Sequence, residues 1–240
     1  MVVTSRFGLL VCLLSIPALV ASGQDEKAKA KKKAAENPAF VAVKDVVGLP
    51  RVLIVGDSIS IGYTVPVREA LQGKANVHRP AANCGPTTRG VQSLDQWLGD
   101  GKWDVIHFNF GLHDLKFVDD AGKNAPPDKG HPQVSESDYE KNLETIVAKM
   151  KKTGAKLIFA TTTPVPSGSD ARIKGDEQKY NAIAIRVMQR NGVAIDDLYG
   201  FAQPRLAEIQ LPANVHFKPD GYKQLADQVA ASALKALRTN

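Results

Sequence analysis

Cysteine is scarce in this 240-residue chain, which contains only Cys12 and Cys84. Two cysteines cannot form the dense disulfide framework that stabilises small secreted domains. A chain of this length can instead bury a substantial apolar core. The fold is therefore expected to depend on packing rather than on covalent cross-links.

Sequence signatures of bound cofactors are also lacking. There is no glycine-rich loop of the Walker or dinucleotide-binding kind, so no cofactor is predicted. His78, His107 and His131 have no metal-ligand spacing with one another or with carboxylates, so no metal site is predicted. His107 lies in the middle of an apolar segment and is expected to be a core residue.

Positive charge is only mildly in excess, and it is unevenly placed. The formal net charge is +6. Lysines concentrate within residues 24–46, a segment without an apolar period, which is interpreted as a solvated basic linker. No aromatic residue is interleaved with these lysines, so a nucleic-acid partner is not predicted.

Near the N-terminus, Arg6 precedes an apolar stretch over residues 8–21, and small residues follow at 21–23. This is the pattern of a secretory signal peptide over residues 1–23, and the stretch is short for a membrane span. An uncleaved anchor is the alternative. Cleavage would give an exported periplasmic or extracellular protein with no stable membrane insertion and with Cys84 as its only thiol.

From residue 47 onwards, short apolar segments alternate with amphipathic ones. This alternation predicts one α/β domain over 47–240, in which helices cover both faces of a five-stranded parallel sheet. Strands are expected at 51–55, 75–78, 103–110, 156–161 and 193–198. Helices are expected at 64–72, 87–98, from Ser135 or Ser137 to Gly154, at 175–190 and at 219–237.

Residues with catalytic potential gather where the expected strands end, which is where parallel sheets bind ligands. A serine and a histidine on converging loops suit nucleophilic acyl transfer. Cys84 is an alternative nucleophile, but no second base is indicated for it and a packing role is favoured. The segments concerned are Gly56-Asp57-Ser58, Asn83-Cys84-Gly85, Gly111-Leu112-His113-Asp114 and, before the last helix, Asn214-Val215-His216-Phe217.

This order of motifs resembles the SGNH or GDSL hydrolase family across nearly all of residues 50–238. The resemblance implies a three-layer α/β/α sandwich of the flavodoxin-like type and a serine esterase activity. It implies that Ser58 is the nucleophile and His216 the base. It also implies an oxyanion hole built from the N–H groups of Ser58 and Gly85, with His113 at the position of the family's oxyanion asparagine.

Two departures from the family pattern need a physical account. A neutral imidazole can donate an N–H to developing negative charge, so His113 is compatible with the oxyanion role, with packing alone as the alternative. The family has an aspartate three residues before its histidine, whereas this chain has Ala213. A backbone carbonyl, or a carboxylate from elsewhere, could orient His216 instead, which leaves a Ser58–His216 dyad as the working interpretation.

Three carboxylates are possible supporting residues: Asp57, Asp114 and Asp220. Asp220 lies in the expected first turn of the last helix, where an acidic residue favours the helix dipole in any case. Asp57 more simply anchors the turn before Ser58. None of the three is therefore assigned as the partner of His216.

The long segment 115–134 is expected to be a loop, which at this length is usually functional or mobile. It carries lysine, aspartate and asparagine side chains rather than many bulky apolar ones. We therefore expect an exported serine esterase that removes a short acyl group, such as acetyl, from a carbohydrate, with a small-molecule or polysaccharide ester as substrate. The alternatives are a lipid or thioester hydrolase, and a catalytically weak or inactive relative that binds carbohydrate.

Overall fold

The computed structural model describes residues 1–2 and 37–239 of the chain. The signal peptide expected over 1–23 and most of the linker expected over 24–46 therefore lie outside the described residues. Among the helices within 37–239, none combines the length and apolar character needed to cross a bilayer.

The centre of the domain is a parallel sheet of five strands in the order β2-β1-β3-β6-β7. The three central strands are almost wholly buried, as expected when helices cover both faces of a parallel sheet. The predicted fold class is thus confirmed. The strands are β1 (Arg51–Val55), β2 (Asn76–His78), β3 (Val105–Phe108), β6 (Lys156–Ala160) and β7 (Ala194–Asp196).

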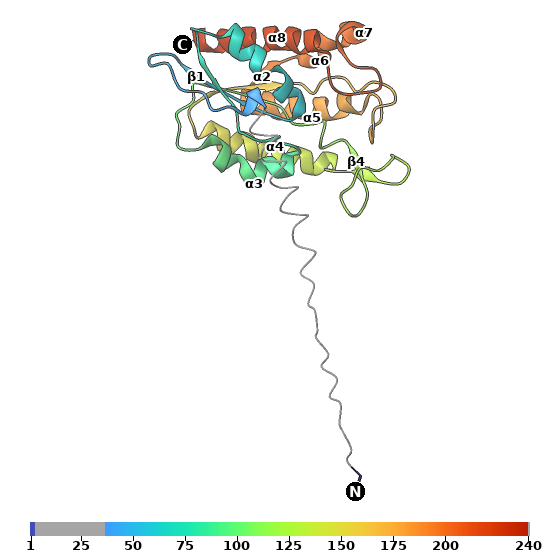
Figure 1. The fold of residues 1–240 in the computed structure, drawn as a ribbon. Helices are drawn as coiled ribbons and strands as arrows, with labels where there is room; N and C mark the ends of the chain where they lie inside the picture. The colour runs from blue at the N-terminus through green and yellow to red at the C-terminus, as the bar shows by residue number, and fades with distance from the viewer. Residues whose placement is uncertain (3–36, 240) are drawn as a thin grey trace.

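Helices form a layer on each side of this sheet, as Figure 1 shows. One layer contains α2 and α8, which pack against each other, together with α6 and α7. The other contains α3, α4 and α5. The long helices are α2 (Ser58–Ala70), α3 (Thr87–Leu98), α4 (Glu136–Lys151), α5 (Asp176–Asn191) and α8 (Pro219–Arg238).

Helix α2 begins earlier than the sequence predicted. The expected start was near residue 64, but the Asp57 side chain accepts a hydrogen bond from the Ile59 N–H and caps a helix that begins at Ser58. Pro66 lies inside α2 without ending it. Gly62 lies against the ring of Tyr222 on α8, where a Cβ would overlap the ring. Tertiary packing thus overrides the weak local helix signal of this segment.

Short elements occupy two regions where the sequence predicted none. The long loop 115–134 contains a small hairpin, β4 (Phe117–Val118) paired with β5 (His131–Pro132), which extends from one end of the layers in Figure 1. Between β7 and α8, the chain forms α6 (Leu198–Ala202), η2 (Gln203–Arg205) and α7 (Leu206–Ile209). Such short pieces have too few residues to establish a periodic pattern.

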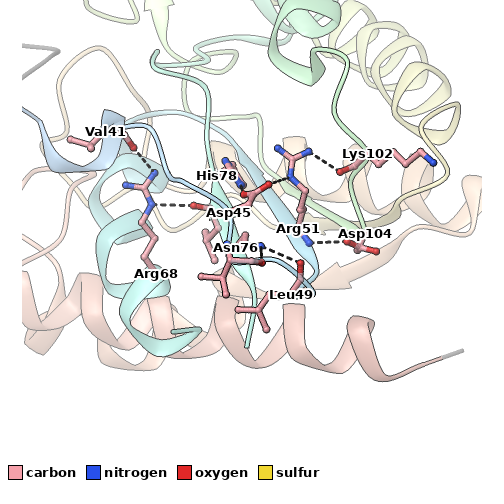
Figure 2. A network of polar contacts seen from close by, with 11 residues as sticks. Val41, Asp45, Leu49, Arg51, Arg68, Asn76, His78, Lys102 and Asp104 are labelled. Atoms are coloured by element: carbon pink, nitrogen blue, oxygen red, sulfur yellow. Dashed lines mark hydrogen bonds and ion pairs between the residues drawn. The ribbon is translucent and has the colours of Figure 1, made fainter. Parts of the chain in front are cut away.

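The described end of the expected linker is packed on the domain, which corrects the boundary placed at residue 47. It includes a short helix, η1 (Pro38–Phe40). The Arg68 guanidinium on α2 donates to the carbonyls of Pro38 and Val41, as Figure 2 shows for part of this network. Residues 37–50, called the strap below, therefore belong to the folded domain.

Two further contacts attach the strap to the sheet (Figure 2). The buried amide of Asn76 accepts from the Val46 N–H and donates to the carbonyls of Val46 and Leu49. Asp45 pairs with Arg51 at 2.9 Å and with His78 at 2.6 Å. The sequence does not show this role, because the contacts mostly use backbone groups of the strap.

His107 is a fully buried core residue, as expected. Its Nε2 lies 3.0 Å from Asp196 Oδ2 at the end of β7, and the Gln228 amide on α8 donates to the other oxygen of Asp196. This polar group crosses from the sheet to the α8 layer. It satisfies a carboxylate that would otherwise be costly to bury.

Candidate active site

The expected nucleophile lies at the end of β1, where the chain turns directly into α2. Ser58 is the first residue of the helix, and the buried Asp57 is its N-cap. Among the described residues, the Ser58 N–H has no hydrogen-bond acceptor. A free N–H at a helix N-terminus favours negative charge beside it. Asp57 thus anchors the turn, as the sequence indicated.

The structure brings Ser58 and His216 together although 158 positions separate them in the chain. The Ser58 Oγ lies 2.9 Å from His216 Nε2. Both side chains are half-buried, so a proton can pass between them at a surface that substrate can still reach. This distance is within the range for a nucleophile and its general base.

The other ring nitrogen of His216 contacts a residue that the sequence analysis did not assign. His216 Nδ1 lies 2.8 Å from the side-chain oxygen of Asn214, and the same oxygen accepts the His216 backbone N–H at 3.0 Å. The backbone donor fixes which end of the amide faces the ring. Asn214 therefore accepts a hydrogen bond from the Nδ1–H, which leaves the lone pair of Nε2 free to accept from Ser58.

Neither of the other positions considered as the partner of His216 takes that place. Ala213 lies in the left-handed backbone region, at φ +49°, and has no side chain to offer. Asp220 is exposed in the first turn of α8, and among the described residues it makes no hydrogen bond to His216. A side-chain amide thus holds the ring, instead of the backbone carbonyl or distant carboxylate that the sequence suggested.

Gly85 lies on the loop after β2 with a left-handed backbone, at φ +62°, which favours glycine. Its N–H donates to the Asn83 side chain at 3.0 Å, so this expected oxyanion donor is occupied in the present conformation. The neighbouring Cys84 is fully buried, and its N–H donates to the Gly56 carbonyl. Burial raises the pKa of the Cys84 thiol to about 11, which disfavours a thiolate nucleophile.

His113 follows Gly111, where a Cβ would overlap Thr162. Among the described residues, neither ring nitrogen of His113 has a hydrogen-bond partner. Burial lowers its pKa, and the nearby cations Lys116, Arg172 and Arg89 lower it further, although Asp57 opposes them. His113 is therefore a neutral imidazole at pH 7 with one N–H free to donate.

Asp114 does not reach the catalytic pair. It is fully buried, and one carboxyl oxygen accepts from both the N–H and the hydroxyl of Thr87 at the start of α3. Burial raises its pKa to about 7, against the opposing effect of the Thr87 hydrogen bonds. Asp114 thus connects the turn that carries His113 to helix α3.

Arg79 is a positioning residue that the sequence analysis missed. Its largely buried guanidinium donates to the Gly56 carbonyl, to the Ala82 carbonyl and to the hydroxyls of Ser60 and Thr64. It therefore ties the turn before Ser58 to the loop that carries Gly85. The signal in the sequence is weak, because an Arg-Pro pair after a strand has many uses.

The site and its surroundings offer no metal centre among the described residues, since no group of three His, Cys, Asp or Glu side chains is placed to hold an ion. Two hollows of about 600 Å³ are lined by other parts of the fold. One lies beside β7 and α8, and the other between the β4–β5 hairpin and the starts of α4 and α5. Neither is lined by Ser58 or His216.

Comparison with known proteins gives a family match. The model of the GDSL-like Lipase/Acylhydrolase family matches residues 54–224, most of the domain just described. No protein among the curated sequences compared matches this chain.

Solved structures share the fold at low sequence identity. A lipase/acylhydrolase from Enterococcus faecalis has a TM-score of 0.62 and 20% identity, over 77% of this chain and 95% of that one. The acetyl xylan esterase AlAXEase has a TM-score of 0.62 and 16% identity, over 76% of this chain and 98% of that one. Axe2, an acetylxylan esterase from Geobacillus stearothermophilus, has a TM-score of 0.61 and 16% identity, over 80% and 95% respectively.

Proposed function

We propose, from the premise that this chain belongs to the GDSL-like lipase/acylhydrolase family, that it removes a short acyl group from a carbohydrate ester through an acyl-enzyme on Ser58. Membership of the family makes the chain a hydrolase of ester bonds. The observation that carries the proposed mechanism is the 2.9 Å contact between Ser58 Oγ and His216 Nε2.

In the first half of the reaction, Ser58 Oγ attacks the ester carbonyl carbon while its proton moves to His216 Nε2. Asn214 holds the Nδ1–H, so the ring accepts this proton on the correct nitrogen. The tetrahedral intermediate then collapses. The bond to the leaving alkoxide breaks, and His216 returns the proton to that oxygen.

In the second half, a water molecule gives its proton to His216 Nε2 and attacks the acyl carbon bound to Ser58. The new intermediate collapses to release the carboxylic acid, and the proton returns to Ser58 Oγ. The same base acts twice, so no further titrating group is needed.

The developing oxyanion would be held by the Ser58 N–H, the His113 ring and the Gly85 N–H. The Ser58 N–H and His113 have no acceptor among the described residues, whereas the Gly85 N–H donates to Asn83. Binding of the substrate carbonyl oxygen would therefore displace the Asn83 side chain from Gly85. A neutral His113 donates without needing acidic pH.

A short acyl group on a sugar is supported by the polarity of the surroundings. The polar and charged side chains of His113, Arg89 and Lys116 lie next to the groups expected to bind the oxyanion. Two structural neighbours are acetyl xylan esterases, which is consistent with this substrate class.

The mechanism is tested with Ser58→Ala and His216→Ala on 4-nitrophenyl esters of increasing acyl length. Each variant should lose about 10⁴-fold or more in kcat with an unchanged melting temperature, and the double variant should lose little more. The wild type should prefer acetyl over octanoyl esters. Near-normal kcat in Ser58→Ala would refute the serine mechanism, and preference for octanoyl would support a lipid ester instead.

A catalytically weak relative that binds carbohydrate is the second candidate. It is favoured by the uncharged partner of His216 and by the occupied Gly85 N–H. This second candidate predicts that the wild type binds a glycan but hydrolyses the acetyl ester of that glycan at a negligible rate. The kinetic comparison above separates the two.

Export is part of the proposal. The positive residue Arg6 and the apolar stretch over 8–21 support a cleaved signal peptide. N-terminal sequencing of the protein recovered from the medium or periplasm should give a mature chain that begins near residue 24. A chain that still begins at Met1 would indicate an anchor.

A further inference from the structure

Three cationic side chains surround His113, and they come from three separate segments. Arg89 is in the first turns of α3, Lys116 follows the turn that carries His113, and Arg172 lies on the loop after β6. Arg89 lies against Gly85, Lys116 is three residues after His113, and Arg172 binds the carbonyl of Leu112, the residue before His113. In agreement with this placement, all three cations lower the pKa of His113.

Arg172 is held in place by the backbone. Its Nε and Nη2 both donate to the Leu112 carbonyl, at 3.0 and 2.9 Å, and its Nη1 donates to the Asp170 carbonyl at 3.1 Å. Because its donors bind neutral oxygens, its charge is not cancelled by these contacts. Arg172 therefore contributes a fixed positive potential behind His113.

Among the described residues, the side chains of Arg89 and Lys116 have hydrogen-bond donors without acceptors. The Arg89 side chain lies over Gly85, with its Cδ 3.5 Å from the position of a Cβ on that residue. Among the described residues, neither Arg89 nor Lys116 donates a hydrogen bond from its side chain, and no carboxylate lies within 4 Å of either charge. By contrast, Lys149 and Arg190 on other faces have carboxylate partners.

Two carboxylates lie near these cations, and each has a hydrogen-bond partner. Asp57 is buried and caps α2, and Asp170 accepts from the Asn124 amide at 2.7 Å. Because these partners are neutral groups, both carboxylates keep their charge, and the three cations exceed them by one at the edge of a site that faces solvent. Such a surface attracts a negatively charged ligand group.

We propose that Arg89 and Lys116 bind an anionic substituent, a carboxylate or a sulfate, on the alcohol part of the ester. The substrate is then an acylated acidic sugar rather than a neutral one. This inference rests on the proposed function for its position beside Ser58, but the binding it describes does not require turnover.

The first test is therefore a binding titration with the Ser58→Ala protein. Glucose, glucuronate and glucose 6-sulfate form a matched series that differs only at one carbon. One of the two anions should bind roughly tenfold more tightly than glucose at low salt, and salt at 0.5 M should erode the difference. The anion that binds better distinguishes carboxylate from sulfate. Equal affinity for all three would overturn the proposal.

The second test compares turnover of an acetylated oligosaccharide that carries the anion favoured in the titration, galacturonate or galactose 6-sulfate, with turnover of an acetylated galactose oligosaccharide. In the wild type the ratio of kcat/KM should favour the acidic ester by roughly tenfold. Arg89→Gln and Lys116→Gln should each reduce this ratio severalfold, mainly through KM.

Lys129→Gln, which removes the same charge from an exposed position in the same loop, should leave the ratio unchanged and is the matched control. A wild type that hydrolyses both esters equally would overturn the anion site but not the esterase. A wild type that binds glucuronate more tightly than glucose but hydrolyses neither ester would overturn the esterase but not the anion site.

Discussion

The partner of His216 is an amide two residues before it, and this choice has a definite chemical consequence. Asn214 fixes the tautomer of the ring, because its oxygen also accepts the backbone N–H of His216. An amide carries no charge, however, so it gives less stabilisation to the imidazolium that forms during reaction than a carboxylate would. In this chain, Asn214 therefore orients the His216 ring but supplies no charge to stabilise the imidazolium.

Asn214→Asp is expected to raise kcat by roughly three- to tenfold, because a carboxylate in the same position stabilises the imidazolium. The acidic limb of the kcat/KM profile should move to higher pH, because the carboxylate favours the protonated ring that cannot act as a base. The measurement is kcat/KM for an acetyl ester from pH 5 to 9.

Ala213→Asp is the control for this change. It adds a carboxylate one residue away, on a left-handed backbone that aspartate tolerates, but Nδ1 already has its acceptor. It should leave the rate and the profile nearly unchanged. If Ala213→Asp had the larger effect, the orienting role of Asn214 would be wrong.

His113 is expected to act as a donor, and its replacement by the family's own residue tests this. His113→Asn should keep kcat within about tenfold, because the amide supplies an N–H, whereas His113→Ala should lose about 10²- to 10³-fold. Equal activity of the Ala and Asn variants in a steady-state ester assay would show that His113 only packs.

Among individual residues, the sequence predicted those that belong to a short motif. Ser58 and His216 lie in short patterns with a fixed order, and the structure brings them into contact. Asn214 has no signature of its own, because the family pattern places a carboxylate three residues before the histidine rather than an amide two residues before it. Arg79 was not predicted because most of its partners, Gly56, Ser60 and Thr64, are far away in sequence. Such contacts leave no local spacing to detect.

At the scale of secondary-structure elements, Asp114 couples the turn after β3 to the start of α3. The raised pKa of its buried carboxyl, about 7, means that the folded protein keeps a proton that the unfolded chain releases near pH 4. The free energy of unfolding therefore falls as pH rises from about 4 to 7, and this contribution is constant above that.

Asp114→Asn should remove this pH dependence. The amide oxygen can still accept from Thr87, and the charge is gone. The stability of the variant relative to the wild type should increase by on the order of a few kcal/mol between pH 4 and pH 7. Denaturant titrations at several pH values measure this, and parallel curves for the two proteins would contradict it.

Elements with a strong period were predicted closely, whereas those that depend on tertiary contacts were not. The amphipathic patterns of α3 and α8 gave their bounds almost to the residue. The start of α2 depends on the Asp57 cap and on packing of Gly62 against Tyr222, which involves a residue on a distant helix. The short elements α6, η2 and α7 between β7 and α8 have too few residues to show a periodic pattern.

At the scale of the whole molecule, the strap extends the domain beyond its sequence-predicted boundary. Its backbone supplies polar groups to Asn76 and Arg68 (Figure 2). The layered parallel sheet follows from the alternation of strands and helices, whereas the order of its strands comes from the structure. The packing of the strap does not follow from that alternation, because its contacts to Asn76 and Arg68 use its backbone groups, which leave no signal in the sequence.

Asn76→Ala should lower the free energy of unfolding by about 1–3 kcal/mol, since three hydrogen bonds to the strap are lost at a buried position. The catalytic rate at low temperature should be unchanged, because the amide lies at the start of β2, away from Ser58. Thermal unfolding of both proteins tests this. Replacement of the exposed Gln72 by Ala is the control and should have little effect. An unchanged melting temperature in Asn76→Ala would mean that the strap adds no stability.

The central claim, that Ser58 activated by His216 is the nucleophile, is tested most directly by covalent labelling with a fluorophosphonate followed by peptide mapping. The wild type should carry one label, on Ser58, and His216→Ala should label far more slowly because the hydroxyl has lost its base. A label on a different residue, or equal labelling rates for the wild type and His216→Ala, would contradict the claim.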